Sequence, residues 1–185
     1  DDPDSEIQQY IGENGIVYSY DIKFDVYTYD PDGTLVNTDG STINPDQSTM
    51  QSGITSMTMT SSGNFSEILP GKEENLISQV IKDNYDLLYG EWPKNYDEVV
   101  LVLDQNNEIS TSTLYEIGLL PAAEYEEIME QLNNGETVEN QEHSWSYEEI
   151  CSKEFYLIPE CDYYQEQENG TFQNISDDGQ ALEEL

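Results

Sequence analysis

The sequence predicts an α+β fold in which a mixed, twisted β-sheet carries three or four packed helices. Three observations lead to this fold class. Residues 15–29 alternate between apolar and polar side chains, which is typical of a strand with one buried and one solvated face. The run VVLVL at residues 99–103 is apolar throughout, which is typical of a central strand that is covered on both faces. Beyond residue 73, apolar positions recur with helical spacing.

The first strand is predicted over residues 15–29, at or near the edge of the sheet. Its length favours a bend midway. The side chains on its inward face are Ile16, Tyr18, Tyr20, Ile22, Phe24 and Val26. The tetrapeptide DPDG at residues 30–33 is typical of a turn, and Leu35 and Val36 are expected to return as a hairpin arm. A weaker strand is predicted at residues 54–59, and apolar character returns at residues 65–69.

A helix is predicted from Glu73, followed by the most compact apolar block of the chain. Its buried face consists of Leu76, Ile77, Val80 and Ile81. Gly90 can end this helix, and Pro93 excludes a strand at its own position. Residues 98–104 are then expected to form the central strand.

The second half of the chain contains clear helix-capping signals. Ser110 is expected to cap a helix at residues 111–117 that Gly118 closes, and Pro121 fits the first turn of the next helix. The buried stripe of that helix is predicted to be Tyr125, Ile128, Met129 and Leu132. Ser146 and Glu149 fit a capping box, and residues 155–158 a strand. The anchors of a final loop or hairpin are predicted to be Tyr163, Tyr164 and Phe172.

The charge balance limits the classes of partner. Among 185 residues there are 40 Asp and Glu against 5 Lys and Arg, all five of them lysines, which gives a net charge of −35. Nucleic acid and anionic lipid headgroups should therefore be repelled. The interpretation favoured is a solvated acidic surface, and the alternative is a field that concentrates cationic peptides or divalent ions. We expect one domain over residues 1–185, with a possible division into lobes at residues 1–64 and 65–185.

No catalytic, cofactor-binding or metal site is predicted. His143 is the only histidine, so it can form neither a histidine-rich metal site nor a supported Ser-His-Asp triad. Carboxylate pairs are too numerous to locate a glycosidase pair. The sequences DPDG and NTDG lack the ligand spacing of a calcium loop, so hairpin turns are favoured. Cys151 and Cys161 flank a predicted strand that would hold them apart, so no disulfide is expected between them.

Five segments in one order resemble the extracellular region of the MacB/FtsX-like ABC transporter permeases of Gram-positive bacteria. They are FSEILPG (65–71), NYDLLYGEWPKNYDEVVLVLDQNNEIS (84–110), LYEIGL (114–119), SWSYEEI (144–150) and DYYQEQENGTFQNIS (162–176). The resemblance covers residues 15–178. The given sequence does not contain the segment that, in this family, returns to the membrane after the last motif. The structural signature that it carries over is Gly90, Trp92, Pro93, Glu98 and Gly118.

The resemblance implies a fold like that of the MacB periplasmic domain and a non-catalytic role. Such a domain couples ATP-driven movement of membrane helices to export, extraction or sensing of peptides, lipids or lipoproteins. Its implied location is the extracellular face of the membrane, within an integral membrane protein. Its implied partners are the transmembrane helices and ATP-binding domain of the same transporter and a peptide or lipid-linked substrate. The alternatives are a free-standing surface binding module, such as an adhesin or solute binder, and, less favoured, a glycan hydrolase.

Overall fold

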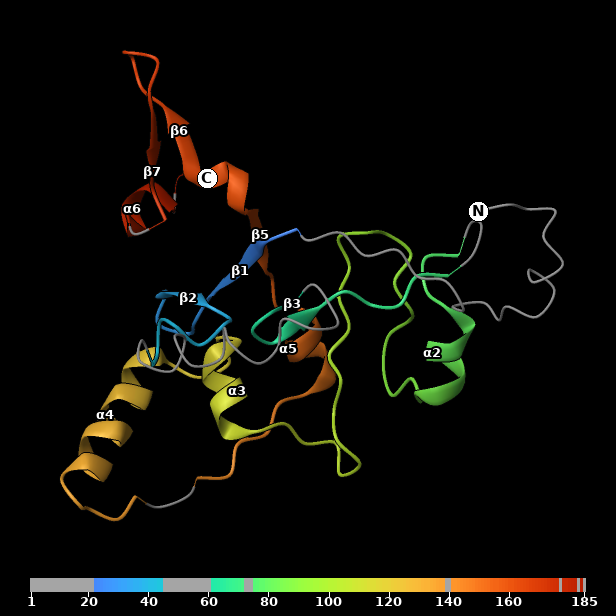
Figure 1. Ribbon diagram of the computed structural model, residues 1–185. Coiled ribbons are helices and arrows are strands. Elements are labelled where there is room, and N and C mark those ends of the chain that lie inside the picture. Colours follow the sequence, from blue (N-terminus) through green and yellow to red (C-terminus); the bar gives the residue numbers. More distant parts are fainter. Residues whose placement is uncertain are drawn as a thin grey trace, which may run out of the picture.

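The computed structural model of the chain describes residues 22–44, 61–71, 75–138, 141–176, 178–182 and 184. These residues form a mixed α+β fold of small antiparallel sheets and several helices (Figure 1). In chain order the elements are β1 (Phe24–Tyr29), β2 (Leu35–Asn37), β3 (Ser61–Ser62), β4 (Phe65–Ser66), α2 (Gln79–Asn84), α3 (Thr111–Glu116), α4 (Ala122–Asn133), α5 (Tyr147–Cys151), β5 (Tyr156–Pro159), the 3₁₀ helix η2 (Glu160–Tyr163), β6 (Tyr164–Glu166), β7 (Phe172–Asn174) and α6 (Gly179–Leu182).

The largest sheet has three strands in the order β2-β1-β5. Both pairings are antiparallel, with Tyr27 opposite Asn37 on one side and opposite Tyr156 on the other. The other strands form two two-stranded sheets, β3 with β4 and β6 with β7. Every strand pair in the described part of the chain is antiparallel, so the mixed sheet that the sequence predicted is not found there.

β1 is the middle strand of a three-stranded sheet, so it is not an edge strand, and of the two predicted positions only the near-edge one fits. Val26 is buried on the predicted inward face, and Tyr27 is buried on the opposite face against Ile158 and Tyr163. Ile22 is exposed, because the ladder begins only at the pair of Phe24 with Pro159. The other predicted inward side chains, Ile16, Tyr18 and Tyr20, lie outside the described residues, as does the strand predicted at residues 54–59.

The turn after β1 confirms the interpretation of DPDG as a hairpin turn. The backbone N–H of Gly33 donates to the carbonyl of Asp30 at 3.0 Å, and Gly33 has φ +83°. The Asp30 carboxylate accepts the backbone N–H groups of Asp32 and Thr34 at 3.0 and 2.8 Å. This side chain therefore folds back onto its own turn, as aspartates often do at that position.

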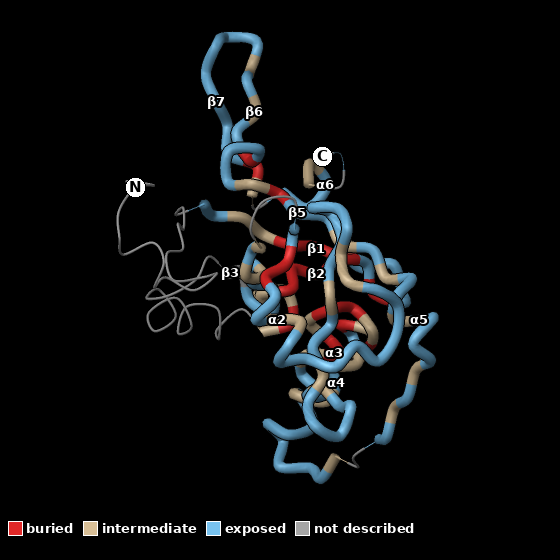
Figure 2. The backbone as a smooth tube through the Cα atoms, turned by 90° about the vertical axis from the view of Figure 1, so that its right-hand side faces the viewer, coloured by how far each residue is buried: buried red, intermediate tan, exposed pale blue. Residues whose placement is uncertain are grey.

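The buried side chains form two small clusters, one on each side of the three-stranded sheet's central region. Figure 2 shows the buried backbone concentrated at β1, β2 and α3, while the β6–β7 hairpin projects away from it. The first cluster consists of Val36, Ile43, Leu114, Tyr115, Leu120 and Ala122. The second consists of Tyr27, Ile158, Tyr163 and Ile175. The core is thin, as the modest apolar content of the sequence indicates.

Two of the predicted helix starts are confirmed. Ser110 caps α3, where its Oγ accepts the backbone N–H of Thr113 at 3.2 Å. Ser146 and Glu149 form the predicted capping box of α5. These caps depend on residues three positions apart in the sequence, which is why the pattern alone identifies them.

The other helices depart from the prediction in length or burial. α2 begins only after Ser78, since Ile77 is instead bridged to Pro70 and buried there. In α4, Tyr125, Ile128 and Met129 are half-buried, as predicted for one stripe, but Leu132 is exposed. The helix projects beyond the sheet at that end (Figure 1), so nothing described covers its last turn.

The C-terminal motif folds as the predicted hairpin, but only one of its three expected anchors is buried. Tyr163 is 4% exposed, whereas Tyr164 and Phe172 are exposed. The latter two lie on the β6–β7 ribbon, which projects away from the rest of the described structure in Figure 2. Cys151 and Cys161 are both exposed and free, so the prediction that they are unpaired is confirmed.

Candidate functional site

Residues 99–103, here called the VVLVL segment, do not form the predicted central strand. They belong to no strand, and Val99, Leu101 and Val102 are 57%, 41% and 58% exposed. The two sides of β1 are already occupied by β2 and β5, so the main sheet has no central position left for this segment. The prediction was wrong because an apolar run indicates only that a segment tends to be buried. It does not identify the part of the protein that buries it.

Two turns built on carboxylates fix the ends of the VVLVL segment. At its start, Glu98 accepts the backbone N–H of Lys94 at 2.7 Å and the side-chain amide of Asn95 at 2.6 Å. These hydrogen bonds, the Lys94 backbone first, hold the pKa of Glu98 below its ordinary value. At its end, Asp104 accepts the backbone N–H groups of Asn106 and Glu108 at 2.8 and 2.9 Å.

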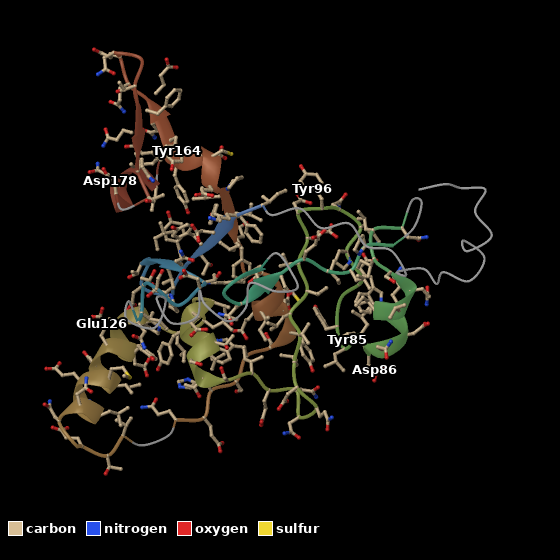
Figure 3. All side chains as sticks on the ribbon, viewed as in Figure 1. Tyr85, Asp86, Tyr96, Glu126, Tyr164 and Asp178 are labelled. Atoms are coloured by element: carbon tan, nitrogen blue, oxygen red, sulfur yellow. The ribbon has the colours of Figure 1, made fainter. Side chains whose placement is uncertain are left out.

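Exposed apolar side chains are frequent in the stretch of chain that contains this segment. The exposed members are Tyr85, Leu87, Leu88, Tyr89, Tyr96, Val99, Leu101 and Val102, here called the 85–102 surface. Tyr89 stacks on Tyr147 of α5, with ring centroids 5.5 Å apart. In Figure 3 the side chain of Tyr96 points away from the ribbon, in line with its 96% exposure. Exposed apolar side chains that gather in a patch mark interaction sites more often than solitary ones do.

Four of the five signature residues lie among the members of this surface in the sequence. Gly90 has φ +76°, a conformation that side chains disfavour. α2 ends at Asn84 with Tyr85 as its C-cap, so Gly90 does not end that helix as predicted. Trp92 and Pro93 are half-buried, and Glu98 forms the turn described above.

The fifth signature residue, Gly118, lies at a separate and closely packed junction. It follows α3 with φ +66°, and its N–H donates to the carbonyl of Tyr115 at 3.0 Å, which closes the helix as predicted. A Cβ at this position would lie 2.9 Å from Thr28 Cγ2 and 3.1 Å from both Lys153 Nζ and the Tyr29 carbonyl. Only glycine therefore fits both the backbone conformation and the space.

Two charged residues hold the junction together, and sequence reasoning missed the role of both. Lys153 Nζ donates to the backbone carbonyls of Tyr29 and Gly118, the latter at 2.7 Å. Burial lowers the pKa of Lys153, and the charge of Asp30 opposes that shift. Asp30 is 6% exposed and accepts the N–H of Ala122, at the start of α4, at 2.9 Å. The junction thus joins β1, the end of α3, the start of α4 and the chain after α5.

A second polar network, partly buried, links β1 to the 3₁₀ helix η2. The Tyr163 hydroxyl donates to Asp25 Oδ2 at 2.6 Å and lies 3.2 Å from the Tyr27 hydroxyl. Burial, and then the hydrogen bond to Asp25, raises the pKa of Tyr163 far above its ordinary value. Burial likewise raises the pKa of Tyr27.

The variant Tyr163→Phe is expected to cost about 1–3 kcal/mol near neutral pH, because a buried hydrogen bond to a carboxylate is lost. A folded-state pKa above the unfolded value means that the stabilisation is full below pH ~10 and decreases as the pH rises above it. The free energy of unfolding in urea, measured from pH 7 to about pH 11, should show the wild-type advantage shrinking at the alkaline end. An advantage that stays constant would contradict the network.

Gly90→Val should destabilise the chain by about 1–2 kcal/mol, because a β-branched side chain is strained at positive φ. Nothing lies within 4 Å of the Cβ position, so no steric clash adds to this cost. Pro93→Ala should cost less than about 1 kcal/mol, through the unfolded state alone. Urea unfolding of the two variants checks the order, and equal, negligible losses would show that this turn is unconstrained.

The described part of the chain offers few other groups that could form a catalytic, metal or ligand site. His143 stacks on Trp145, with centroids 5.8 Å apart. Among the described residues, no group of three or more His, Cys, Asp or Glu side chains lies close enough to hold a metal ion. A shallow hollow beside β2, bounded by Asn37, Thr42 and Leu182 among others, has no charged residue in its lining.

Within the described ranges, no helix is both long and apolar enough to cross a membrane.

The fold and the site together define an α+β domain with one rigid polar junction and one exposed apolar surface. Comparison with known proteins finds no match, whether with protein-family models, curated proteins or solved structures.

Proposed function

We propose that the chain is the non-catalytic extracellular domain of an ABC transporter permease of the MacB/FtsX-like type. In this role it couples ATP-driven movement of membrane helices to export, extraction or sensing of peptides, lipids or lipoproteins. Its partners are the transmembrane helices and ATP-binding domain of the same transporter and a peptide or lipid-linked substrate. The proposal includes a fold like that of the MacB periplasmic domain.

The observation that carries the proposal is the order of five family-like motifs along residues 65–176. The structure supplies a physical reason for one of them. The Leu-Gly helix end of LYEIGL positions Gly118 where it packs against Thr28 and Lys153. A domain that transmits movement needs elements that are joined rigidly, and this junction joins a strand to two helices.

The acidic surface supports the same role. With a net charge of −35 and no arginine, the chain is repelled by anionic headgroups. A domain with this charge stands in solvent above a membrane without adhering to it.

A free-standing surface binding module remains the second candidate, and one observation favours it. The 85–102 surface exposes eight large apolar side chains, which a binding module would use to hold its ligand. This surface is also compatible with a transporter domain that contacts its substrate, so membrane attachment is what distinguishes the two candidates.

The exposed thiols of Cys151 and Cys161 provide the test. Cells that produce the full-length protein are treated with a membrane-impermeant maleimide, and their membranes are then washed with alkaline carbonate. The proposal predicts labelling in intact cells, retention in the washed membranes and co-purification with an ATP-binding subunit. The double variant Cys151→Ser, Cys161→Ser is the labelling control. Release by carbonate would favour the binding module, and labelling only after lysis would contradict both candidates.

A further inference from the structure

We propose that the VVLVL segment is a docking edge for an extended, lysine- or arginine-bearing segment of a partner polypeptide, which pairs with it backbone to backbone. This inference goes beyond the proposed function, because it would hold equally for a free-standing binding module. Four properties of the segment carry it: its unpaired backbone, its fixed ends, its exposed side chains and the charge around it.

The backbone of the segment is unpaired within the described structure. No hydrogen bond joins the N–H or carbonyl groups of residues 99–103 to any other described residue. The flanking residues differ, since the N–H of Glu98 donates to the Asn95 carbonyl and that of Asp104 to the Glu108 carbonyl. In Figure 1 this part of the chain runs as a long, uncoiled stretch. An uncoiled segment with free donors and acceptors is the template that strand addition uses.

The two turns that bracket the segment reduce the cost of binding. The Glu98 turn and the Asp104 turn each consist of at least two hydrogen bonds to a carboxylate. Five residues held between two fixed ends lose less conformational freedom on pairing than a free loop would. The segment is therefore preorganised for a partner strand.

The side chains of the segment favour a strand partner over solvent. Val99, Leu101 and Val102 are exposed, and Val100 and Leu103 are only half-buried. Valine and leucine side chains on a pleated strand pack well against apolar neighbours on an added strand. The occupant should accordingly carry apolar side chains at alternate positions.

The surrounding charge selects the chemistry of that occupant. The carboxylate residues Asp97, Glu98, Asp104 and Glu108 lie within five residues of the segment in the sequence, two on either side of it. Lys94, the cation nearest to the segment in the sequence, is paired with Glu91. Lysine or arginine beside the apolar positions would complement these carboxylates and accelerate association. A second copy of the chain also carries −35, so self-pairing is opposed.

The test uses a short peptide with four lysines and three valines in alternation, blocked at both ends. A peptide of the same pattern with glutamate in place of lysine tests charge. The Lys-Val peptide with N-methylated alternate amides tests backbone pairing. Binding to the isotope-labelled chain is followed by NMR, with hydrogen exchange measured at residues 99–103.

The expected result is binding of the Lys-Val peptide with slowed exchange at residues 99–103. N-methylation should lower the affinity of the peptide at least about tenfold. Raising the salt concentration from about 0.05 M to about 0.5 M should lower the affinity of the unmodified Lys-Val peptide by at least a similar factor. Val102→Pro removes a donor from an exposed, unpaired position and should weaken binding by at least a similar factor. Leu132→Ala, at an exposed apolar residue on α4, is the matched control and should leave binding unchanged.

Several outcomes would overturn the proposal. Slow exchange at residues 99–103 in the dilute free chain would mean that another part of the same chain covers the segment. Protection that grows with protein concentration would identify a second copy as the occupant. Equal binding of the glutamate peptide, or no binding of the Lys-Val peptide at about 1 mM, would show that the segment does not select cationic strands.

Discussion

Gly118→Ala is expected to lower the free energy of unfolding by about 2–5 kcal/mol. Two costs add. A Cβ at φ +66° is strained by about 1–2 kcal/mol, and forcing it against Thr28 Cγ2, Lys153 Nζ and the Tyr29 carbonyl costs a further ~1–3 kcal/mol. Two of these three neighbours are backbone or β-branched, so they cannot move aside cheaply.

Gly90→Ala is the matched control for this substitution. Gly90 has a similar positive φ, +76°, but nothing lies within 4 Å of its Cβ position. Gly90→Ala should lower the free energy of unfolding by only about 1 kcal/mol, because only the strain of a side chain at positive φ contributes. Urea unfolding of both variants measures the difference. Equal losses would show that Gly118 has room for a side chain and that the junction is not closely packed.

Asp30→Ala is expected to lower the free energy of unfolding by about 3–5 kcal/mol. The carboxylate accepts three backbone N–H groups, from Asp32, Thr34 and Ala122. Each hydrogen bond to a charged group contributes roughly 1.5–3 kcal/mol, and the contributions are not additive because they share one acceptor. The N–H of Ala122 is buried at the start of α4 and would be left without its partner.

Asp32→Ala is the control, because Asp32 is an exposed aspartate in the same turn. Asp32→Ala should change the free energy of unfolding by no more than about 0.5 kcal/mol, as is usual for surface positions. Thermal and urea unfolding of the two variants test the prediction. A loss for Asp30→Ala that lies within about 1 kcal/mol of the control would contradict the role assigned to the carboxylate.

The features that the sequence predicted correctly depend on neighbouring residues. The Ser110 cap, the Ser146 capping box and the DPDG turn each form within five residues, so their side chains and backbone partners are adjacent in any fold. The hairpin at β6 and β7 belongs to the same group. The position of Gly118 after α3 was predicted for the same local reason.

The features that were missed depend on residues far apart in the sequence. Gly118 packs on Thr28 and Lys153, and the Tyr163 hydroxyl bonds Asp25; no local pattern specifies either contact. The central place of β1 depends on β5, which follows it by more than a hundred residues. The VVLVL segment shows most clearly what a local pattern does not specify, because the same five apolar residues are compatible with a buried central strand and with an unpaired, exposed segment.

The most direct test of the transporter assignment is made in the intact protein, by replacing residues 15–178 with a short flexible linker. Two quantities are measured in the same membranes: basal ATPase activity, and the transport or resistance phenotype that loss of the whole transporter abolishes. The account predicts that ATPase activity is largely retained while the phenotype is lost, because the domain couples movement to substrate and performs no chemistry itself. An intact phenotype after the replacement, or turnover of a peptide or glycan by the purified domain alone, would contradict it.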